Sequence, residues 1–208
     1  MFMLADKSVK EFLQETASDA PVPGGGSIAA MSGATAAALT AMVANLTIGK
    51  KKYVEVEEQM KVIQERVNGS RNQLIELIDK DAESFNGVMA CFKMPKETDE
   101  EKESRKEAIQ QATKEAARVP MSIAEKVMEL MIDIETVVQK GNNNAVTDGA
   151  VAAMMARTAI LAALYNVKIN LGSIKDEDFV HEMARKASNL EEQAQIQEKQ
   201  ILQQVILD

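Results

Sequence analysis

Two stretches of small residues constrain the fold of this chain more than any other feature. They run from Ile28 to Ile48 and from Gly149 to about Asn170, and alanine is the commonest residue in both. Alanine is the best helix former, and small side chains let neighbouring helices approach closely. Each stretch follows a polar loop rich in glycine or asparagine. We therefore expect two central helices that pack together, against larger partners or a second copy of the chain, with both loops at one rim.

The remaining sequence also favours helices over strands. Aromatic residues make up only 3% of the 208 residues, and leucine, glutamate, lysine, glutamine and methionine are abundant. These residues favour helices, whereas strands are enriched in aromatic and β-branched residues in alternation. The length suits one domain with its own core. The predicted fold class is all-α: a bundle of long helices in a single domain over residues 1–208.

Capping signals mark where further helices begin. Ser8 with Glu11 and Thr98 with Glu101 have the spacing of capping boxes. Proline inside a helix removes a hydrogen bond, so a kink or restart is expected there. We expect further helices from Ser8 to before Asp19, from Val54 to about Phe92, from Thr98 to Lys140 with a kink or restart at Pro120, and from Ser173 to Ile206.

Charge and composition argue against several classes of protein. The net charge of −8 argues against a general nucleic-acid surface, which needs a basic field. A single cysteine, Cys91, cannot form an internal disulfide, so nothing suggests an oxidising compartment. There is no apolar run of signal-peptide form, and no uninterrupted apolar stretch reaches membrane-spanning length; Ile28–Ile48 comes nearest. We expect a cytoplasmic, soluble protein without a membrane or nucleic-acid partner.

Metal and nucleotide chemistry lack their usual residues. The chain has one cysteine and one histidine, His181, so a zinc cluster is not expected, and both residues have ordinary interpretations as packing or surface groups. Gly24-Gly-Gly lacks the Gly-Lys-Ser/Thr ending of a P-loop and follows no predicted strand. We expect no metal site.

The first polar loop, Ala20-Pro-Val-Pro-Gly-Gly-Gly-Ser-Ile-Ala-Ala30, combines stiff and open backbone. Its two prolines restrict the entry to extended conformations, and Gly24, Gly25 and Gly26 leave backbone amides unshielded. Ser27 has a residue type favoured at an N-cap, immediately before the helix. A helix N-terminus with free N–H groups suits a carboxylate, a phosphate or a polarised carbonyl. The alternative is that the glycines form only a tight connection.

A second candidate is Asp81, which interrupts an apolar stripe. The three-and-four spacing of one helix face is followed by Leu74, Leu77, Ile78, Asp81, Ala82, Phe85, Val88, Met89 and Phe92. A carboxylate on such a face is costly unless it is paired, hydrogen-bonded or used in chemistry. Burial alone raises its pKa, whereas donors or a cation lower it. Two structural interpretations stay open: an Asp that accepts buried hydrogen bonds, or a stripe that emerges into water at that turn.

The second polar loop is Gly141-Asn-Asn-Asn-Ala-Val-Thr-Asp148. Asparagine tolerates turn conformations, and Thr147 and Asp148 suit the start of the following helix. A further polar run, Lys50-Lys-Lys52, follows Gly49 at the end of the first small-residue helix. These lysines are either a solvated face or a contact for a negatively charged ligand tail.

Four ordered segments together resemble a known family. They are Ala20–Ala30, Met42-Val-Ala-Asn-Leu-Thr-Ile-Gly-Lys-Lys51, Asp81-Ala-Glu-Ser-Phe85 and Gly141–Asp148. They are similar to the formiminotransferase-cyclodeaminase family, specifically its cyclodeaminase domain and the related stand-alone methenyltetrahydrofolate cyclohydrolases. The resemblance covers nearly the whole chain.

The resemblance implies an all-helical homodimer whose substrate is a one-carbon tetrahydrofolate, with or without a polyglutamate tail, and no separate cofactor. Cyclodeaminases convert 5-formiminotetrahydrofolate to 5,10-methenyltetrahydrofolate and ammonia, and cyclohydrolases interconvert the methenyl compound with 10-formyltetrahydrofolate. Bifunctional relatives carry a transferase domain for which this chain has no room, which leaves the exact reaction open. We place cyclodeaminase slightly ahead of cyclohydrolase; a folate-binding module without catalysis and a helical scaffold are the alternatives from other classes.

The resemblance also assigns residues. It places the family's catalytic carboxylate on Asp81, which can stabilise positive charge, act as a base, shuttle a proton or attack directly as a nucleophile. The sequence does not choose among these roles. Lys50, Lys51 and Lys52 are candidates for the polyglutamate tail. The residues expected to hold the pterin or the glutamate portion are Pro23, Gly24, Gly25, Gly26, Ser27, Asn142, Asn144, Thr147 and Asp148.

Overall fold

The computed structural model describes residues 3–207, and within that range the fold is all-α, as the sequence predicts. No strand occurs among these residues. The helices are α1 (Val9–Thr16), α2 (Gly25–Thr47), α3 (Glu57–Phe92), α4 (Asp99–Lys140), α5 (Val146–Leu171) and α6 (Glu177–Gln203). Short 3-10 turns lie at η1 (Leu4–Asp6), η2 (Lys51–Val56) and η3 (Asn143–Ala145).

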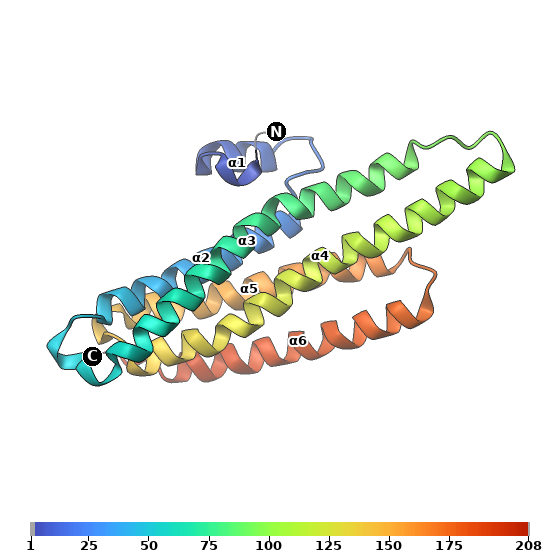
Figure 1. Ribbon diagram of the computed structural model, residues 1–208. Helices are drawn as coiled ribbons and strands as arrows, with labels where there is room; N and C mark the ends of the chain where they lie inside the picture. Colours follow the sequence, from blue (N-terminus) through green and yellow to red (C-terminus); the bar gives the residue numbers. More distant parts are fainter. Residues whose placement is uncertain (1–2, 208) are drawn as a thin grey trace.

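The five long helices run up and down as an elongated bundle, with the short α1 at its side (Figure 1). α2 packs against α3 and α5, and α5 also packs against α4 and α6. The small-residue helices are therefore central, as predicted. A Cβ added at Gly33 would lie 2.6 Å from a methyl group of Val127, which shows how closely α2 approaches α4. Several alanines of the two helices are completely buried: Ala29, Ala30, Ala36, Ala37, Ala44, Ala152, Ala153, Ala156, Ala159 and Ala163.

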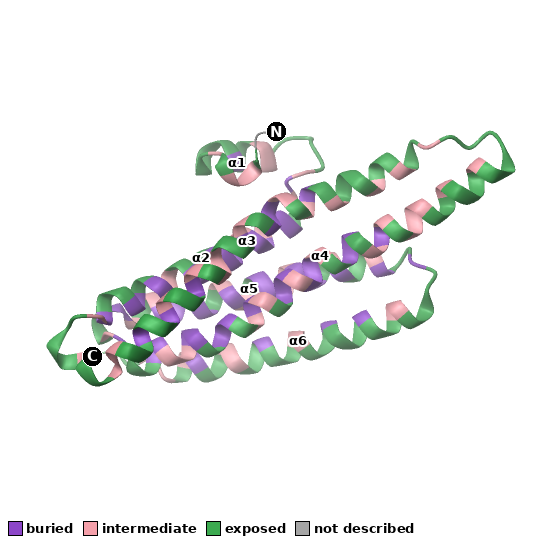
Figure 2. Ribbon diagram, in the orientation of Figure 1, coloured by how far each residue is buried: buried purple, intermediate pink, exposed green. Residues whose placement is uncertain are grey.

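The apolar stripe of α3 is buried only in part. Its buried residues end at Ala82, and the large side chains beyond it, Phe85, Met89 and Phe92, are exposed. The reason is visible in Figures 1 and 2: the end of α3 and the beginning of α4 extend past the other helices as a mostly exposed arm. The expectation of one continuous buried face is therefore wrong beyond Ala82. Asp81 lies in the last buried turn.

Helix α4 is continuous through Pro120, contrary to the expected kink or restart. Proline has no N–H, so the carbonyl of Ala116, four residues earlier, loses its usual helical donor. The side-chain Nδ2 of Asn170 donates to this carbonyl at 2.9 Å. A side chain of α5 thus supplies the hydrogen bond that Pro120 removes from α4.

Several predicted boundaries shift. The capping boxes at Ser8 and Thr98 are confirmed. Ser27 is not the N-cap of α2; Gly24 is, so Ser27 lies inside the first turn. The helix expected from Val54 begins at Glu57 after a 3-10 turn, the one expected from Gly149 begins at Val146, and the last helix ends at Gln203 rather than Ile206.

The two polar loops do not meet at one rim of the chain. α2 and α5 pack antiparallel: Gly25 at the start of α2 lies beside Asn166 near the end of α5, and Asn142 contacts Thr47 at the end of α2. At 1.5 Å of rise per residue, the length of α2 separates the loops by roughly 30 Å. When two helices pack antiparallel, the loops that precede them lie at opposite ends of the pair.

By length and composition, two helical segments are apolar enough to cross a membrane: Gly25–Thr47 and Asn143–Leu171. This corrects the expectation that no stretch reaches that length. About two thirds of the first window and half of the second are buried inside the bundle. Central helices of a helical bundle pass the same test, because they too are apolar on most sides.

An ion pair between a buried carboxylate and a partly exposed guanidinium joins α3 to α4. The Asp133 carboxylate is almost completely buried. It receives two hydrogen bonds from the Arg66 guanidinium, one of them from Nε to Oδ2 at 2.8 Å and the other from Nη2 to Oδ1. Two parallel bonds of this kind fix the relative position of the two helices.

Candidate functional site

A cavity of about 300 Å³ lies where the glycine loop, α3 and α5 meet. Asp81 is the only ionisable residue among those that line it. The walls combine backbone, carboxamide and apolar groups. The lining residues are Pro21, Val22, Gly24, Gly25, Gly26, Asp81, Ser84, Phe85, Val88, Ala116, Asn166, Ile169 and Asn170.

The Asp81 carboxylate lies directly against the first turn of α2. A Cβ built on Gly26 would be 2.0 Å from its Oδ1 and 2.6 Å from its Oδ2, so only glycine leaves room for the carboxylate there. The fully buried Ser27 hydroxyl lies 3.2 Å from Oδ2 of Asp81 and 2.9 Å from the carbonyl of Ile78. The glycine loop and Asp81 therefore form one unit, and Ser27 holds the carboxylate rather than capping the helix.

The electrostatic environment of Asp81 favours retention of a proton. Burial raises the pKa of its carboxyl, while the hydroxyl and the backbone N–H of Ser27 act in the opposite direction and only partly offset this. No lysine, arginine or histidine lines the cavity. A carboxyl that is half-buried, has a raised pKa and faces a cavity has the properties of a group that exchanges protons with a ligand.

Two carboxamides that the sequence analysis did not single out face the same cavity. Asn166 and Asn170 lie one helical turn apart near the end of α5. Asn166 lies against Gly25, where an added Cβ would be 3.1 Å from its Nδ2. The available signal was two asparagines at a four-residue spacing in a mostly apolar helix. The groups that they contact belong to α2 and α4 and are distant in sequence.

The other predicted site residues gather at the opposite end of the bundle. Asn142 has a structural role, because its backbone N–H donates to Thr47 Oγ1 at 2.9 Å and its Nδ2 donates to the Leu46 carbonyl at 2.9 Å. The backbone N–H of Asn143 donates to the Tyr53 hydroxyl at 3.0 Å, so η2 with Lys51 and Lys52 lies beside this loop. Lys50 directly precedes η2. Asp148 lies in the first turn of α5, half-buried.

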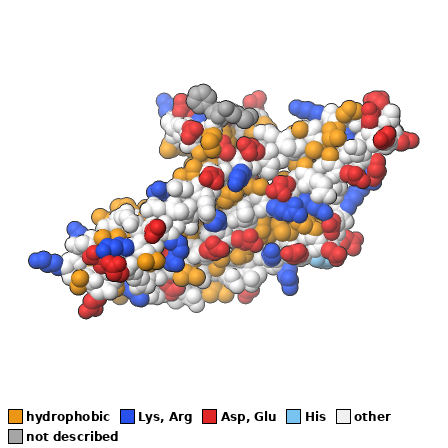
Figure 3. All heavy atoms as spheres, viewed as in Figure 1, with side chains coloured by type: hydrophobic (Ala, Val, Ile, Leu, Met, Phe, Trp, Pro, Cys, Tyr) orange, Lys and Arg blue, Asp and Glu red, His pale blue; other side chains and the backbone are white. Residues whose placement is uncertain are grey.

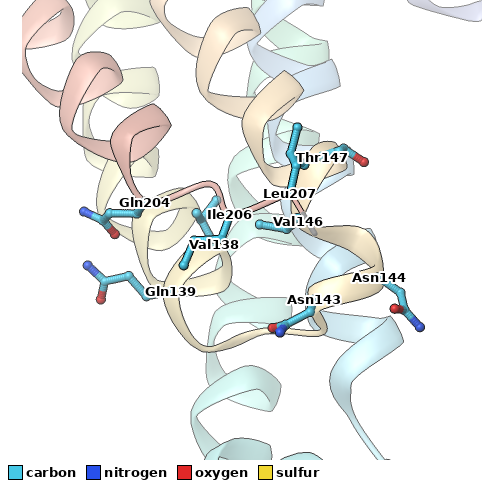
Figure 4. A pocket seen from close by; sticks show the side chains of 9 residues that line it. All are labelled: Val138, Gln139, Asn143, Asn144, Val146, Thr147, Gln204, Ile206 and Leu207. Carbon is cyan, nitrogen blue, oxygen red and sulfur yellow. The ribbon is translucent and has the colours of Figure 1, made fainter.

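A second cavity, of about 600 Å³, opens at this end between the loop and the C-terminal segment (Figure 4). Its lining residues are Val138, Gln139, Asn143, Asn144, Val146, Thr147, Gln204, Ile206 and Leu207. Asn144 and Thr147 line this cavity, whereas Asp81 lines the first. Within one chain, the predicted site thus divides into a carboxylate end, with Pro23 to Ser27 and Asp81, and an amide-and-lysine end.

The remaining reactive side chains are isolated. His181 is exposed on α6, and Cys91 is a half-buried free thiol on the arm. Between residues 3 and 207 no three His, Cys, Asp or Glu side chains are grouped so that they could hold a metal ion.

Fold and cavity together define a helical-bundle protein whose central feature is a half-buried carboxylate against a glycine turn. The model of the formiminotransferase-cyclodeaminase family matches residues 8–189, and the chain belongs to this family.

Individual relatives carry two different names. Methenyltetrahydrofolate cyclohydrolase of Methylorubrum extorquens is 40% identical over 188 residues, which are 90% of each chain. Formimidoyltransferase-cyclodeaminase of Rattus norvegicus is 33% identical over 199 residues, 96% of this chain but only 37% of the rat protein. A crystal structure of formiminotetrahydrofolate cyclodeaminase from Thermotoga maritima matches with a TM-score of 0.86 and 34% identity over 96% of both chains.

Proposed function

We propose that the chain is a formiminotetrahydrofolate cyclodeaminase, which closes 5-formiminotetrahydrofolate to 5,10-methenyltetrahydrofolate with release of ammonia. Family membership supports the substrate class, and the similar Thermotoga maritima protein carries this name. The observation that carries the proposal is Asp81: one carboxyl with a raised pKa, in a cavity without basic side chains. Such a cavity suits a cationic amidine more than an anion.

The reaction needs a group that accepts one proton and returns it. N10 attacks the carbon of the protonated formimino group, CH=NH₂⁺, and the C=N π electrons move to the nitrogen, which becomes NH₂. The new bond leaves a proton on N10 that must be removed. The C–N bond to the former imine nitrogen then breaks, and this nitrogen must receive a proton to leave as ammonia. A carboxylate that takes the first proton and delivers the second balances both steps, and a raised pKa makes delivery easier. Asp81 fits this shuttle role.

Methenyltetrahydrofolate cyclohydrolase is the second candidate, because the relative from Methylorubrum extorquens with this name is 40% identical over 90% of both chains. In that reaction water attacks the same amidinium carbon, and the bond from this carbon to N5 then breaks to leave the formyl group on N10. Asp81 would act as a base toward the attacking water; of the two water protons, one ends on N5 and the other passes to solvent.

Turnover of the two folates separates these reactions. The protein is incubated with each substrate while methenyl absorbance and ammonia are followed. We expect ammonia and methenyl product from the formimino compound, and Asp81→Asn should abolish both with the fold intact. Glu83→Gln, which changes an exposed carboxylate outside this cavity on the same helix, is the matched control and should keep full activity. Methenyl hydrolysis without ammonia release would establish the second candidate, and full activity of Asp81→Asn would remove Asp81 from the mechanism.

We also propose a homodimer formed through α2 and α5. Helix α2 has no charged residue, yet Met42 and Leu46 on it are exposed, as are Val151 and Met154 on α5. The view in Figure 3, by contrast, shows charged side chains of both signs distributed over much of the surface. Exposed apolar side chains on a helix without charged residues are typical of an interface between subunits. A second copy packed antiparallel there would bring opposite ends of the two chains together.

The dimer is tested with a charge placed on this face. The double variant Met42→Glu/Met154→Glu should halve the molar mass measured by light scattering. Ile196→Glu, at an exposed position of α6, is the control and should leave the molar mass unchanged. A wild-type protein that is monomeric at micromolar concentration refutes the dimer.

A further inference from the structure

The Asp81 cavity contains a second set of hydrogen-bonding groups whose orientation is determined by the fold. Asn166 Nδ2 donates to the carbonyl of Ala162, one turn earlier in α5, at 2.9 Å. A carbonyl accepts only from the NH₂ side of a carboxamide, so this bond fixes which way the amide is turned. The Oδ1 of Asn166 receives no hydrogen bond from the described part of the chain, although the residue lines the cavity.

Asn170 is oriented in the same sense. Its Nδ2 donates to the Ala116 carbonyl at 2.9 Å and to the Asn166 backbone carbonyl at 2.8 Å. Both NH₂ hydrogens are therefore used, and its Oδ1 also has no protein donor among residues 3–207. Beside the Asp81 carboxylate, the cavity thus presents two amide oxygens that can only accept hydrogen bonds.

The side chains of Asn166 and Asp81 lie against two consecutive glycines of α2, Gly25 and Gly26. Added Cβ atoms at Gly25 and Gly26 would meet the Asn166 carboxamide at 3.1 Å and the Asp81 carboxylate at 2.0 Å, respectively. At Gly25 the nearer atom is Nδ2 and Oδ1 lies at 3.6 Å, so the Asn166 carboxamide and the Asp81 carboxylate lie against one short piece of backbone at the start of α2. Both side chains also line the same cavity, so one ligand bound there can contact both of them.

We propose that Asn166 is a specificity-determining residue whose Oδ1 accepts a hydrogen bond from the N–H of the formimino group. The inference rests on the proposed folate function and deepens it. A protonated formimino group, CH=NH₂⁺, and a formyl group, CH=O, have nearly the same shape, but only the first donates a hydrogen bond. An amide oxygen facing this position attracts the N–H and repels the formyl oxygen, which is how a polar site distinguishes isosteric ligands.

Binding of 5-formimino- and 5-formyltetrahydrofolate tests this role. Affinities are measured by calorimetry in the Asp81→Asn background, which keeps an oxygen beside Ser27 and prevents turnover. We expect the Asp81→Asn protein to bind the formimino ligand more tightly than the formyl ligand. Adding Asn166→Leu should reduce this preference about 10- to 100-fold, the effect of losing a hydrogen bond to a charged donor. Affinity for the formyl ligand should stay within threefold. Asn166→Asp, which keeps an acceptor, should restore the preference.

A matched control places the same change elsewhere: Asn189→Leu replaces an exposed asparagine of α6 and should leave both affinities unchanged. An equal loss of affinity for both ligands in Asn166→Leu would show that the residue only shapes the cavity. Unchanged affinity for both ligands would show that Asn166 does not contact the formimino group. Either result overturns the proposal. A parent protein that binds both folates without preference also overturns it and leaves the folate function standing. Absence of binding to either folate overturns the proposed function as well.

Discussion

Gly26→Ala tests whether the glycine turn exists to admit the Asp81 carboxylate. The added Cβ would lie 2.0 Å from Oδ1, 2.4 Å from Cγ and 2.6 Å from Oδ2 of Asp81. These separations are far below van der Waals contact, so the carboxylate must retreat by more than about 1 Å to reach the normal carbon–oxygen separation of about 3.5 Å. The clash involves the end of a side chain next to an open cavity, which can rotate away, rather than backbone.

Stability and activity should therefore respond differently. Alanine is about 0.5–1 kcal/mol better than glycine inside a helix, which offsets about 1 kcal/mol for the lost Ser27–Asp81 hydrogen bond. The free energy of unfolding should change by less than about 1 kcal/mol. Displacement of a catalytic group by about 1 Å can cost about 100-fold in rate, so kcat/KM should fall by about that factor.

The assay combines urea unfolding with initial rates on both folates. Gly69→Ala is the matched control, because nothing lies within 4 Å of a Cβ at that position inside α3; it should raise stability by about 0.5–1 kcal/mol and leave activity unchanged. Wild-type activity in Gly26→Ala would refute the role of the close contact. A loss of several kcal/mol of stability would show that Asp81 is held rigidly by its surroundings and cannot rotate.

Two further changes test the energetics of individual groups. Burial raises the Asp81 pKa above its ordinary 3.8, so the folded state binds this proton more tightly than the unfolded state. The stability of the wild type therefore falls as pH rises from 3.8 through the raised pKa. Asp81→Asn should be more stable than wild type at pH 7, and melting curves should show this difference vanish below about pH 3.8. Arg66→Met leaves the buried Asp133 carboxylate without its partner, although the guanidinium itself is partly exposed, and should cost about 1–3 kcal/mol in urea unfolding. Lys106→Met breaks an exposed pair with Glu103 and should cost less than about 0.5 kcal/mol. Equal losses of stability in these two variants would contradict the burial argument.

Local patterns in the sequence determined most of the secondary structure. The capping boxes at Ser8 and Thr98 depend on residues only three positions apart, so they were predictable. The alanine-rich composition of α2 and α5 likewise placed both helices in the centre. Asp81 stood out because a charged residue on an apolar helix face is visible in the periodicity alone. These features depend on interactions within one or two helical turns.

Tertiary structure decided which distant residues share a cavity. The antiparallel packing of α2 and α5 separates the two polar loops, and no local pattern specifies the direction in which helices pack. Pro120 does not break α4 because a side chain fifty residues later, Asn170, satisfies the freed carbonyl. The local pattern at Ser27 predicts a helix cap, but its hydroxyl contacts Ile78 and Asp81 on α3, which are distant in sequence. Hydrogen bonds between helices depend on how the faces are brought together, which the linear sequence does not display.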